Sequence, residues 1–225
     1  SSLAHELNQP LAAINNYCMG AVARLRSGNA SAADLAPALE KASAQAVRAG
    51  SIIARIRSFV KRSAPQRRQA SVRELVAGAV ELAEIEARRL QIRIQIDLQP
   101  DLPNLYVDPL LIEQVLVNLL KNGAEAMHHQ DPKRIGGVIR LRAHLPAAEP
   151  SMLAIDVSDQ GPGVAEQDLA QLFDPFFTTK NDGMGIGLNI CRSIVESHQG
   201  RLWVENHAPP QPGCTFHLLL PVQPV

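Results

Sequence analysis

Apolar residues recur at spacings of three and four along the start of the chain. This period places them on one face of a helix, which we predict over residues 1–27. A second seam with the same period predicts another helix over residues 32–63. The segment Ser27–Ser31 is a short turn, and Ser31 followed by Asp34 is typical of a helix N-terminus. The apolar positions of the first helix are Leu3, Leu7, Leu11, Ile14, Cys18, Val22 and Leu25.

Two long helices joined by so short a turn form an antiparallel hairpin. Each helix carries an apolar stripe, and one hairpin cannot cover both stripes. We therefore predict that two chains pair their hairpins into a four-helix bundle, which makes the protein a homodimer. The alternative is a hairpin that folds onto the second domain of its own chain.

The rest of the chain mixes helical and alternating patterns. A polar, proline-containing segment predicts a linker over residues 64–70, between a helical domain (1–63) and a second domain (71–225). This order of elements predicts an α+β protein whose second domain is an α/β sandwich, with helices on one face of a sheet. Helices are predicted at Val72–Leu90, Leu110–Met127 and Leu188–Ser197. Strands are predicted at Ile92–Leu98, Val138–Leu145, Met152–Val157, Leu202–Glu205 and Thr215–Leu220.

Composition narrows the classes of function. The 22 basic and 22 acidic residues cancel, which argues against a nucleic-acid-binding protein. Three widely spaced cysteines predict neither a zinc site nor a disulfide framework and fit a reducing cytoplasm. No apolar run reaches the roughly 20 residues of a membrane span, so we expect no direct membrane contact here. Because the chain starts without Met, we expect a cytoplasmic fragment whose missing upstream sequence would carry any membrane anchor.

A set of asparagine, aspartate and glycine residues has the chemistry of a nucleotide site. Asn118 and Asn122 lie four residues apart, so both project from one helix face and can help to hold a magnesium ion. Asp159 ends an apolar strand and can accept a hydrogen bond from the amine of adenine. Glycines allow close backbone approach, and the last two precede a helix whose free amides favour phosphate. They are Gly161, Gly163, Gly183, Gly185 and Gly187.

A histidine and a carboxylate stand side by side in the first predicted helix. Neutral imidazole is a good nucleophile near pH 7, because its reference pKa is about 6.5. Glu6 can select the tautomer of His5 that leaves one ring nitrogen free. A lone His-Glu pair would be an ordinary helix surface, but a nucleotide site in the same chain makes His5 a candidate phosphoryl acceptor.

Taken together, these motifs resemble those of the sensor histidine kinases of two-component signalling. The match runs from His5 to Phe216, nearly the whole chain. Leu3–Leu11 resembles the H box of the family, Asn118–Asn122 the N box, Asp159–Gly163 the G1 box, Phe173–Lys180 the F box, Gly183–Gly187 the G2 box and Gly213–Phe216 the closing turn.

The resemblance implies ATP and Mg²⁺ as cofactors. It assigns magnesium chiefly to Asn122, with Asn118 close to the phosphates. It makes Asp159 the residue that reads adenine, in a pocket shaped by Gly161 and Gly163. By analogy with cations near the nucleotide in the family, Lys180 would approach the γ-phosphate.

The resemblance also implies a phosphotransfer reaction. His5 would be the nucleophile in an ATP-dependent autophosphorylation, and Glu6 would orient its ring and take its proton. The phosphoryl group would then pass to an aspartate in the receiver domain of a separate response regulator. Whether the first step occurs in cis or in trans does not follow from spacing.

Two rival functions remain at this point. One is a non-catalytic dimeric scaffold that binds nucleotide, and the other is a chaperone-type or topoisomerase-type ATPase that shares the second domain. Asn118 stands where related hydrolytic ATPases carry a glutamate base, which favours transfer to His5 over transfer to water. Gly123, where alanine is commoner, indicates close packing against that helix position.

Overall fold

The computed structural model describes residues 3–28, 31–60, 65–130, 136–180 and 185–222. The chain divides into two compact units, Ser1–Ser63 and Ala64–Val225. None of the helices within the described ranges has the length and apolar character needed to cross a membrane.

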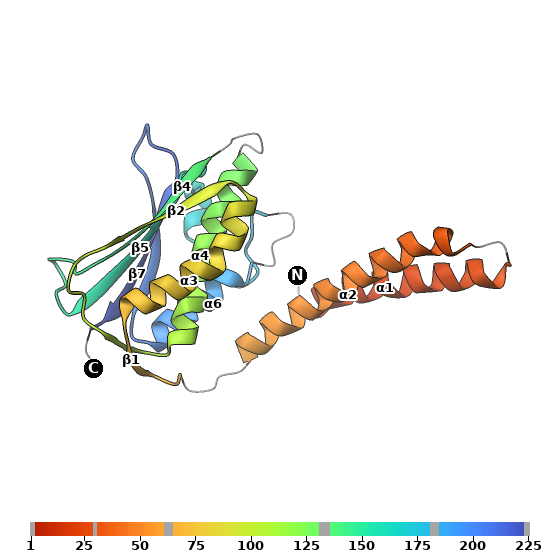
Figure 1. The fold of residues 1–225 in the computed structure, drawn as a ribbon, viewed down its shortest axis with the longest axis horizontal. Coiled ribbons are helices and arrows are strands. Elements are labelled where there is room, and N and C mark those ends of the chain that lie inside the picture. The colour runs from red at the N-terminus through yellow and green to blue at the C-terminus, as the bar shows by residue number, and fades with distance from the viewer. Residues whose placement is uncertain (1–2, 29–30, 61–64, 131–135, 181–184, 223–225) are drawn as a thin grey trace. The chain divides into compact units, whose positions relative to one another are not determined.

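The first unit is an antiparallel hairpin of helices α1 (Leu3–Arg26) and α2 (Ala32–Val60), as predicted (Figure 1). A reciprocal cap begins the second helix. The Ser31 amide and hydroxyl both donate to Asp34 Oδ2, at 2.9 and 2.6 Å, and the Asp34 amide donates to Ser31 Oγ at 3.3 Å. These bonds hold the pKa of Asp34 below its ordinary value. The predicted cap is therefore confirmed.

The single hairpin buries only part of its apolar residues. Ala21, Ala42 and Ala49 are buried, whereas Cys18 of the predicted stripe is exposed. Large apolar side chains on both helices are also exposed: Leu11, Met19, Val22, Leu25, Leu39 and Val47.

The second unit contains a five-stranded sheet in the order β2-β4-β5-β7-β6, with β2 and β4 parallel and the other neighbours antiparallel. Helices α3, α4 and α6 cover one face of this sheet (Figure 1). The helices are α3 (Val72–Arg89), α4 (Pro109–Gln130), α5 (Glu166–Leu169) and α6 (Gly187–Ser197). The strands of this sheet are β2 (Ile92–Leu98), β4 (Gly137–His144), β5 (Met152–Ser158), β6 (Arg201–Asn206) and β7 (Cys214–Pro221). The predicted α+β class is confirmed.

The core lies between the sheet and the helices. Alternate residues of the central strands point into it, because successive strand side chains face opposite sides. On β5, for example, Leu153, Ile155 and Val157 are almost completely buried. They meet the apolar face of α4, whose fully buried residues include Ile112, Leu116, Leu119 and Leu120.

Three short elements were not predicted. Strands β1 (Arg68–Ala70) and β3 (Leu105–Val107) form a two-stranded antiparallel sheet, and α5 is four residues long. Strand β1 uses the last three residues of the segment predicted to be a linker. Three residues are too few to show a period, and the partner strand lies more than thirty positions away, so no local pattern could reveal the pairing.

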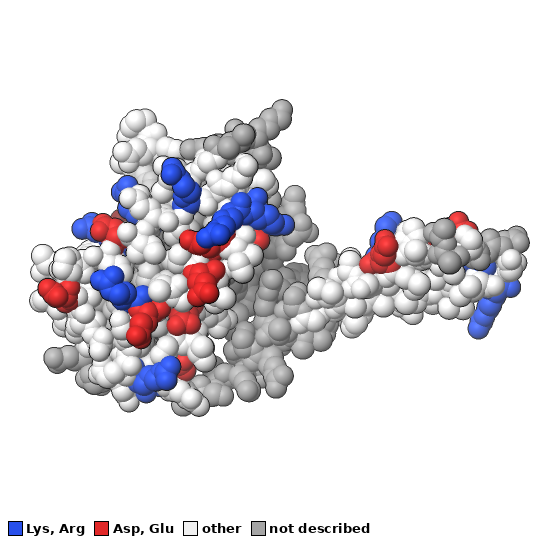
Figure 2. All heavy atoms as spheres, viewed as in Figure 1, with Lys and Arg blue, Asp and Glu red and all other residues white. Residues whose placement is uncertain are grey.

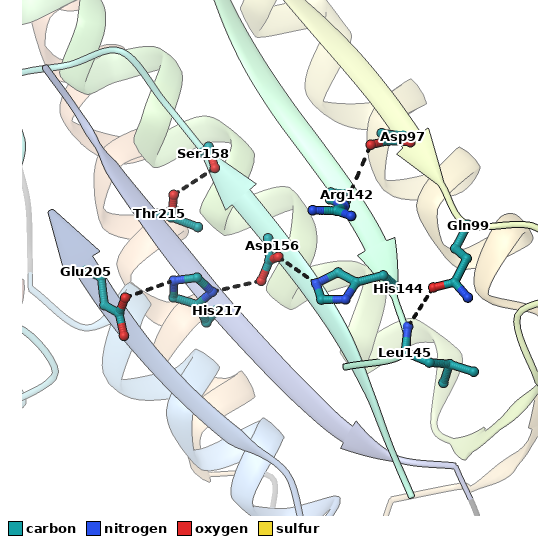
Figure 3. A network of polar contacts seen from close by, with 10 residues as sticks. All are labelled: Asp97, Gln99, Arg142, His144, Leu145, Asp156, Ser158, Glu205, Thr215 and His217. Atoms are coloured by element: carbon teal, nitrogen blue, oxygen red, sulfur yellow. Dashed lines mark hydrogen bonds and ion pairs between the residues drawn. The ribbon is translucent and has the colours of Figure 1, made fainter. Parts of the chain in front are cut away.

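Polar side chains form a row across the other face of the large sheet. Figure 3 shows the centre of this row, where Asp156 lies between two histidines. Its Oδ1 is 2.8 Å from His217 Nδ1, and its Oδ2 is 3.0 Å from His144 Nε2. On the edge strand, the Trp203 ring stacks on His217 with 5.0 Å between centroids. At the other end of the row, Arg142 pairs with Asp97 at 3.7 Å.

These contacts predict an acid-sensitive contribution to stability. Burial alone would raise the pKa of Asp156, but the hydrogen bonds from His217 and His144 outweigh it and hold this pKa below its ordinary value. For a carboxyl group whose folded-state pKa is lowered, the stabilisation is present above the unfolded pKa of about 3.9. It is lost as the pH falls through the lower folded value.

We expect Asp156→Asn to lower the free energy of unfolding by about 1–3 kcal/mol at pH 7, because charge-assisted hydrogen bonds are lost. This difference from the parent should shrink below about pH 4. Urea unfolding can be followed through Trp203, the chain's one tryptophan. Asp97→Asn is the matched control, since its ion pair is exposed and should change stability by less than about 0.5 kcal/mol. A difference that stays constant down to pH 3 would contradict the assignment.

Acidic and basic side chains are interspersed on the face of the second unit that Figure 2 shows. Their mixture agrees with the zero formal net charge.

Candidate functional site

The two asparagines of the predicted N box lie on one face of α4 and meet different partners. Asn118 Nδ2 donates to Cys191 Sγ of α6 at 3.2 Å. A Cβ at Gly187, the first residue of α6, would lie 3.0 Å from Asn118 Oδ1. Asn122 Oδ1 accepts from Lys180 Nζ at 3.1 Å. Residues far apart in sequence are thus brought together around this helix face.

Asp159 follows β5 directly and is buried, with only 3% of its surface exposed. Its Oδ1 accepts from the Gly161 amide at 2.7 Å, and its Oδ2 accepts from the Cys214 thiol at 3.3 Å. Burial raises the pKa of Asp159, and the hydrogen bonds from Gly161 and Cys214 offset part of that rise. Carboxylates this buried are unusual unless they are paired or functional.

The glycines around Asp159 leave little room for a side chain. A Cβ at Gly161 would lie 2.9 Å from Asp159 Oδ1, and one at Gly123 would lie 3.2 Å from Asp159 Cβ. The close packing expected at Gly123 is therefore found. Gly163 has a φ of +77°, and a Cβ there would lie 2.8 Å from Asn206 Oδ1. The Asn206 side chain fixes this turn through the amide and carbonyl of Val164, at 2.8 and 2.7 Å.

The F-box segment is anchored on α6 and the core. Phe173 is buried and makes an edge-on contact with Phe216, with 6.5 Å between centroids. The Arg192 guanidinium lies 4.1 Å from the centre of the Phe173 ring, and Asn189 Nδ2 donates to the Phe173 carbonyl at 3.0 Å. These contacts hold the start of the segment that ends at Lys180.

The F and G2 boxes also meet through their backbones. The Phe176 amide donates to the Gly185 carbonyl at 3.0 Å. Phe176 has a φ of +69°, which is rare for a bulky residue and is typical of functional sites. A Cβ at Gly185 would lie 2.3 Å from the Phe177 carbonyl oxygen. Gly185 is therefore needed for this packing, whatever it does for phosphate.

The remaining predicted site residues lie elsewhere or are not described. His5 and Glu6 belong to α1, in the first unit, and side chains there are described from Asn8 onward. Gly183 lies outside the described residues.

Sequence reasoning missed several residues at the site. Glu125, one turn after Asn122, lies 2.5 Å from Lys180 Nζ. Cys214 and Asn206 hold Asp159 and the G1 turn, as described above. A three-residue spacing to Asn122 could have indicated Glu125, whereas Cys214 and Asn206 reach their partners only through the fold.

The oxygen atoms near Lys180 suit a hard cation. The amide oxygen of Asn122 and a carboxylate oxygen of Glu125 both lie against one ammonium group. Magnesium prefers oxygen ligands and is usually held by one or two protein groups together with phosphates. Nowhere in the described part of the chain do three His, Cys, Asp or Glu residues gather as a metal cluster. The donor set therefore fits magnesium that arrives with a nucleotide.

Comparison with known proteins places this geometry in a family. Residues 107–224 match the family described as histidine kinase-, DNA gyrase B- and HSP90-like ATPase. The chain is 43% identical over 223 residues to the C4-dicarboxylate transport sensor protein DctS of Rhodobacter capsulatus, covering 99% of this chain and 33% of that protein. It is also 43% identical over 225 residues to the sensor protein FixL of Bradyrhizobium diazoefficiens, covering 98% and 42%.

A solved structure shares the fold along most of the chain. It is the histidine kinase ThkA in complex with the response regulator protein TrrA, with a TM-score of 0.72 and 24% identity over 98% of this chain and 60% of that one. The chain spans between a third and a half of the length of the two sensor proteins above. It belongs to the sensor histidine kinases, and its C-terminal half is the ATPase domain that this family shares with DNA gyrase B and HSP90.

Proposed function

We propose that this chain is the kinase core of a two-component sensor. Residues 71–225 would bind ATP with magnesium, residues 1–63 would carry the phosphoryl acceptor, and residues 64–70 would connect them. The observation that carries the proposal is the set of polar groups around α4: Asn118 and Asn122 share one helix face, Lys180 contacts Asn122, and the buried Asp159 packs against Gly123 of the same helix. The likeness to sensor proteins across 99% of the chain, His5 included, supports it further.

Each residue of the nucleotide site has a role that its surroundings suit. Asp159, anchored by Gly161 and Cys214, accepts from the adenine amine, and Gly163 shapes the same turn. Asn122 would hold magnesium through its amide oxygen, and the ion would supply charge neutralisation for the phosphates, to which Asn118 would lie close.

Two further groups of residues serve the phosphates. Lys180 reaches the γ-phosphate. Gly183, Gly185 and Gly187 bring backbone amides close to the phosphates at the start of α6.

The chemical step joins the two units. A ring nitrogen of His5 attacks the γ-phosphorus, and the bond from phosphorus to the ADP oxygen breaks. Glu6 orients the ring and takes the proton from its other nitrogen. In the second step the bond from phosphorus to the phosphorylated nitrogen of His5 breaks, and the phosphoryl group moves to a carboxylate oxygen of an aspartate on a response regulator. Because ATP is supplied in the cytoplasm, we place both steps there.

A homodimer is the assembly that the hairpin supports. Its exposed large apolar residues, from Leu11 on α1 to Val47 on α2, form an apolar face whose exposure to water is unfavourable. A second hairpin would cover this face in a four-helix bundle. The complex of ThkA with TrrA supports a response regulator as the partner.

The proposal is tested by incubating the chain with γ-labelled ATP and magnesium. We expect label on the protein that is labile in acid and stable in alkali, as a phosphoramidate is, and no label on His5→Gln. The variant should bind ADP as tightly as the parent, because all the proposed nucleotide ligands belong to residues 71–225. Nucleotide binding without label would favour the scaffold. Phosphate release by His5→Gln at the parent rate would favour the hydrolytic ATPase.

A further inference from the structure

Glu125 and the proposed magnesium ligand Asn122 both contact the ammonium group of Lys180. Glu125 follows Asn122 by three residues on α4, so both side chains lie on the same helix face. Lys180 Nζ lies 3.1 Å from Asn122 Oδ1 and 2.5 Å from Glu125 Oε2. An amide oxygen and a carboxylate oxygen thus face a single positive charge.

The position of Lys180 is set by its own segment. The Lys180 amide donates to Thr178 Oγ1 at 3.1 Å, and Thr178 Oγ1 donates to the Lys180 carbonyl at 3.4 Å. The side chains of Lys180 and Glu125 are 31% and 40% exposed, so the contact is partly shielded from water. A lysine ammonium is a compact, strongly hydrated point charge, and its oxygen ligands resemble those of a hard metal ion.

We propose that Asn122 and Glu125 form one acceptor pair that holds the Lys180 ammonium without nucleotide and a magnesium ion when nucleotide is bound. This proposal rests on the proposed function. A metal ion and the ammonium would repel each other at such short distances, so we expect them to compete for the pair. Phosphate oxygens give the displaced lysine a new partner, so metal and nucleotide bind together. Glu125 is then a further residue of the cation site, and Lys180 keeps metal out until nucleotide arrives.

Removing the ammonium of Lys180 and removing the charge of Glu125 should change the affinity for Mn²⁺ in opposite directions. The test is a calorimetric titration of the full chain with Mn²⁺, with and without ADP. Lys180→Met should bind Mn²⁺ at least about tenfold tighter than the parent when nucleotide is absent, because the competing ammonium is gone. Glu125→Gln should weaken Mn²⁺ binding to the ADP complex by about tenfold. The double variant should lose the gain seen in Lys180→Met.

Matched controls lie on the same helix. Lys121→Met and Glu113→Gln remove the same charges at other positions of α4 and should leave both Mn²⁺ affinities unchanged. Thermal unfolding followed through Trp203 shows that each variant is folded. The proposal is overturned if Lys180→Met gains no affinity for Mn²⁺, or if Glu125→Gln keeps that of the parent. Failure of the parent to bind ADP would instead overturn the proposed function, and the nucleotide-free measurements still test the cation pair.

Discussion

Replacing Asp159 by asparagine is expected to weaken ADP binding by roughly 30- to 150-fold without lowering the free energy of unfolding. The carboxylate is buried, and its oxygens are fixed by the Gly161 amide and the Cys214 thiol. An asparagine retains the shape and one acceptor but directs a donor at the adenine amine. Losing a charged hydrogen bond in such a site costs about 2–3 kcal/mol.

Asp159→Asn should weaken ADP binding but should not weaken the fold. Burial raises the pKa of Asp159 above its unfolded value. A carboxyl group with a raised folded-state pKa reduces stability at pH values above its unfolded pKa, because ionisation is easier in the unfolded chain. A neutral amide removes that penalty. We therefore expect the free energy of unfolding of Asp159→Asn at pH 7 to equal or exceed that of the parent.

Calorimetric titration and urea unfolding measure the two effects separately. Asp156→Asn is the matched control three residues away, on the other face of the sheet. It should lose stability and keep ADP affinity, the reverse of Asp159→Asn. Inosine diphosphate, which carries an oxygen in place of the adenine amine, gives a further check. The parent should prefer ADP, and Asp159→Asn should lose that preference. Equal preference in the two proteins would remove Asp159 from base recognition.

The elements that the sequence predicted are those with a strong local pattern. The alternation of Ile92, Ile94 and Ile96 predicted β2 with its observed bounds, and the apolar period of α3 placed that helix within one residue. Strands β1 and β3 were not predicted because each is three residues long and pairs with a distant partner. Long elements with a local pattern were therefore predicted, and short elements that depend on distant partners were missed.

The candidate site follows the same rule. Asp159 could be named because it ends an apolar strand, and Asn122 because its spacing to Asn118 puts both on one face. The thiol that donates to Asp159 could not be named, since Cys214 is 55 residues away and joins it only through the pairing of β5 with β7.

His198 is a similar case, with no role predicted from spacing. It is buried, and its Nε2 accepts from the Asp108 amide 90 residues earlier, at 3.0 Å. Burial lowers the pKa of His198, which fits a neutral acceptor. Such contacts depend on tertiary structure, so the local pattern of apolar and polar residues cannot predict them.

Gly213→Ala is expected to be strongly destabilising to the second unit. Gly213 has a φ of +107°, and a Cβ there would lie 2.1 Å from the Asp159 carbonyl oxygen and 3.0 Å from Gln160 Cα. These are backbone atoms, so no side-chain rotation can relieve the clash. Strain at this φ and overpacking each cost about 1–3 kcal/mol, and we expect a loss of about 3–5 kcal/mol in the free energy of unfolding.

The same clash should reach the nucleotide site, because the atoms it displaces belong to the segment that carries the Asp159 carboxylate. ADP affinity of the folded Gly213→Ala chain should fall with its stability, unlike that of Asp156→Asn. Gly136→Ala separates strain from clash, since Gly136 has a φ of +88° and open space around its missing Cβ. It should cost about 1–2 kcal/mol and leave ADP binding unchanged. If Gly213→Ala lost no more stability than Gly136→Ala, the contact with Asp159 could not be what holds the base-reading carboxylate in place.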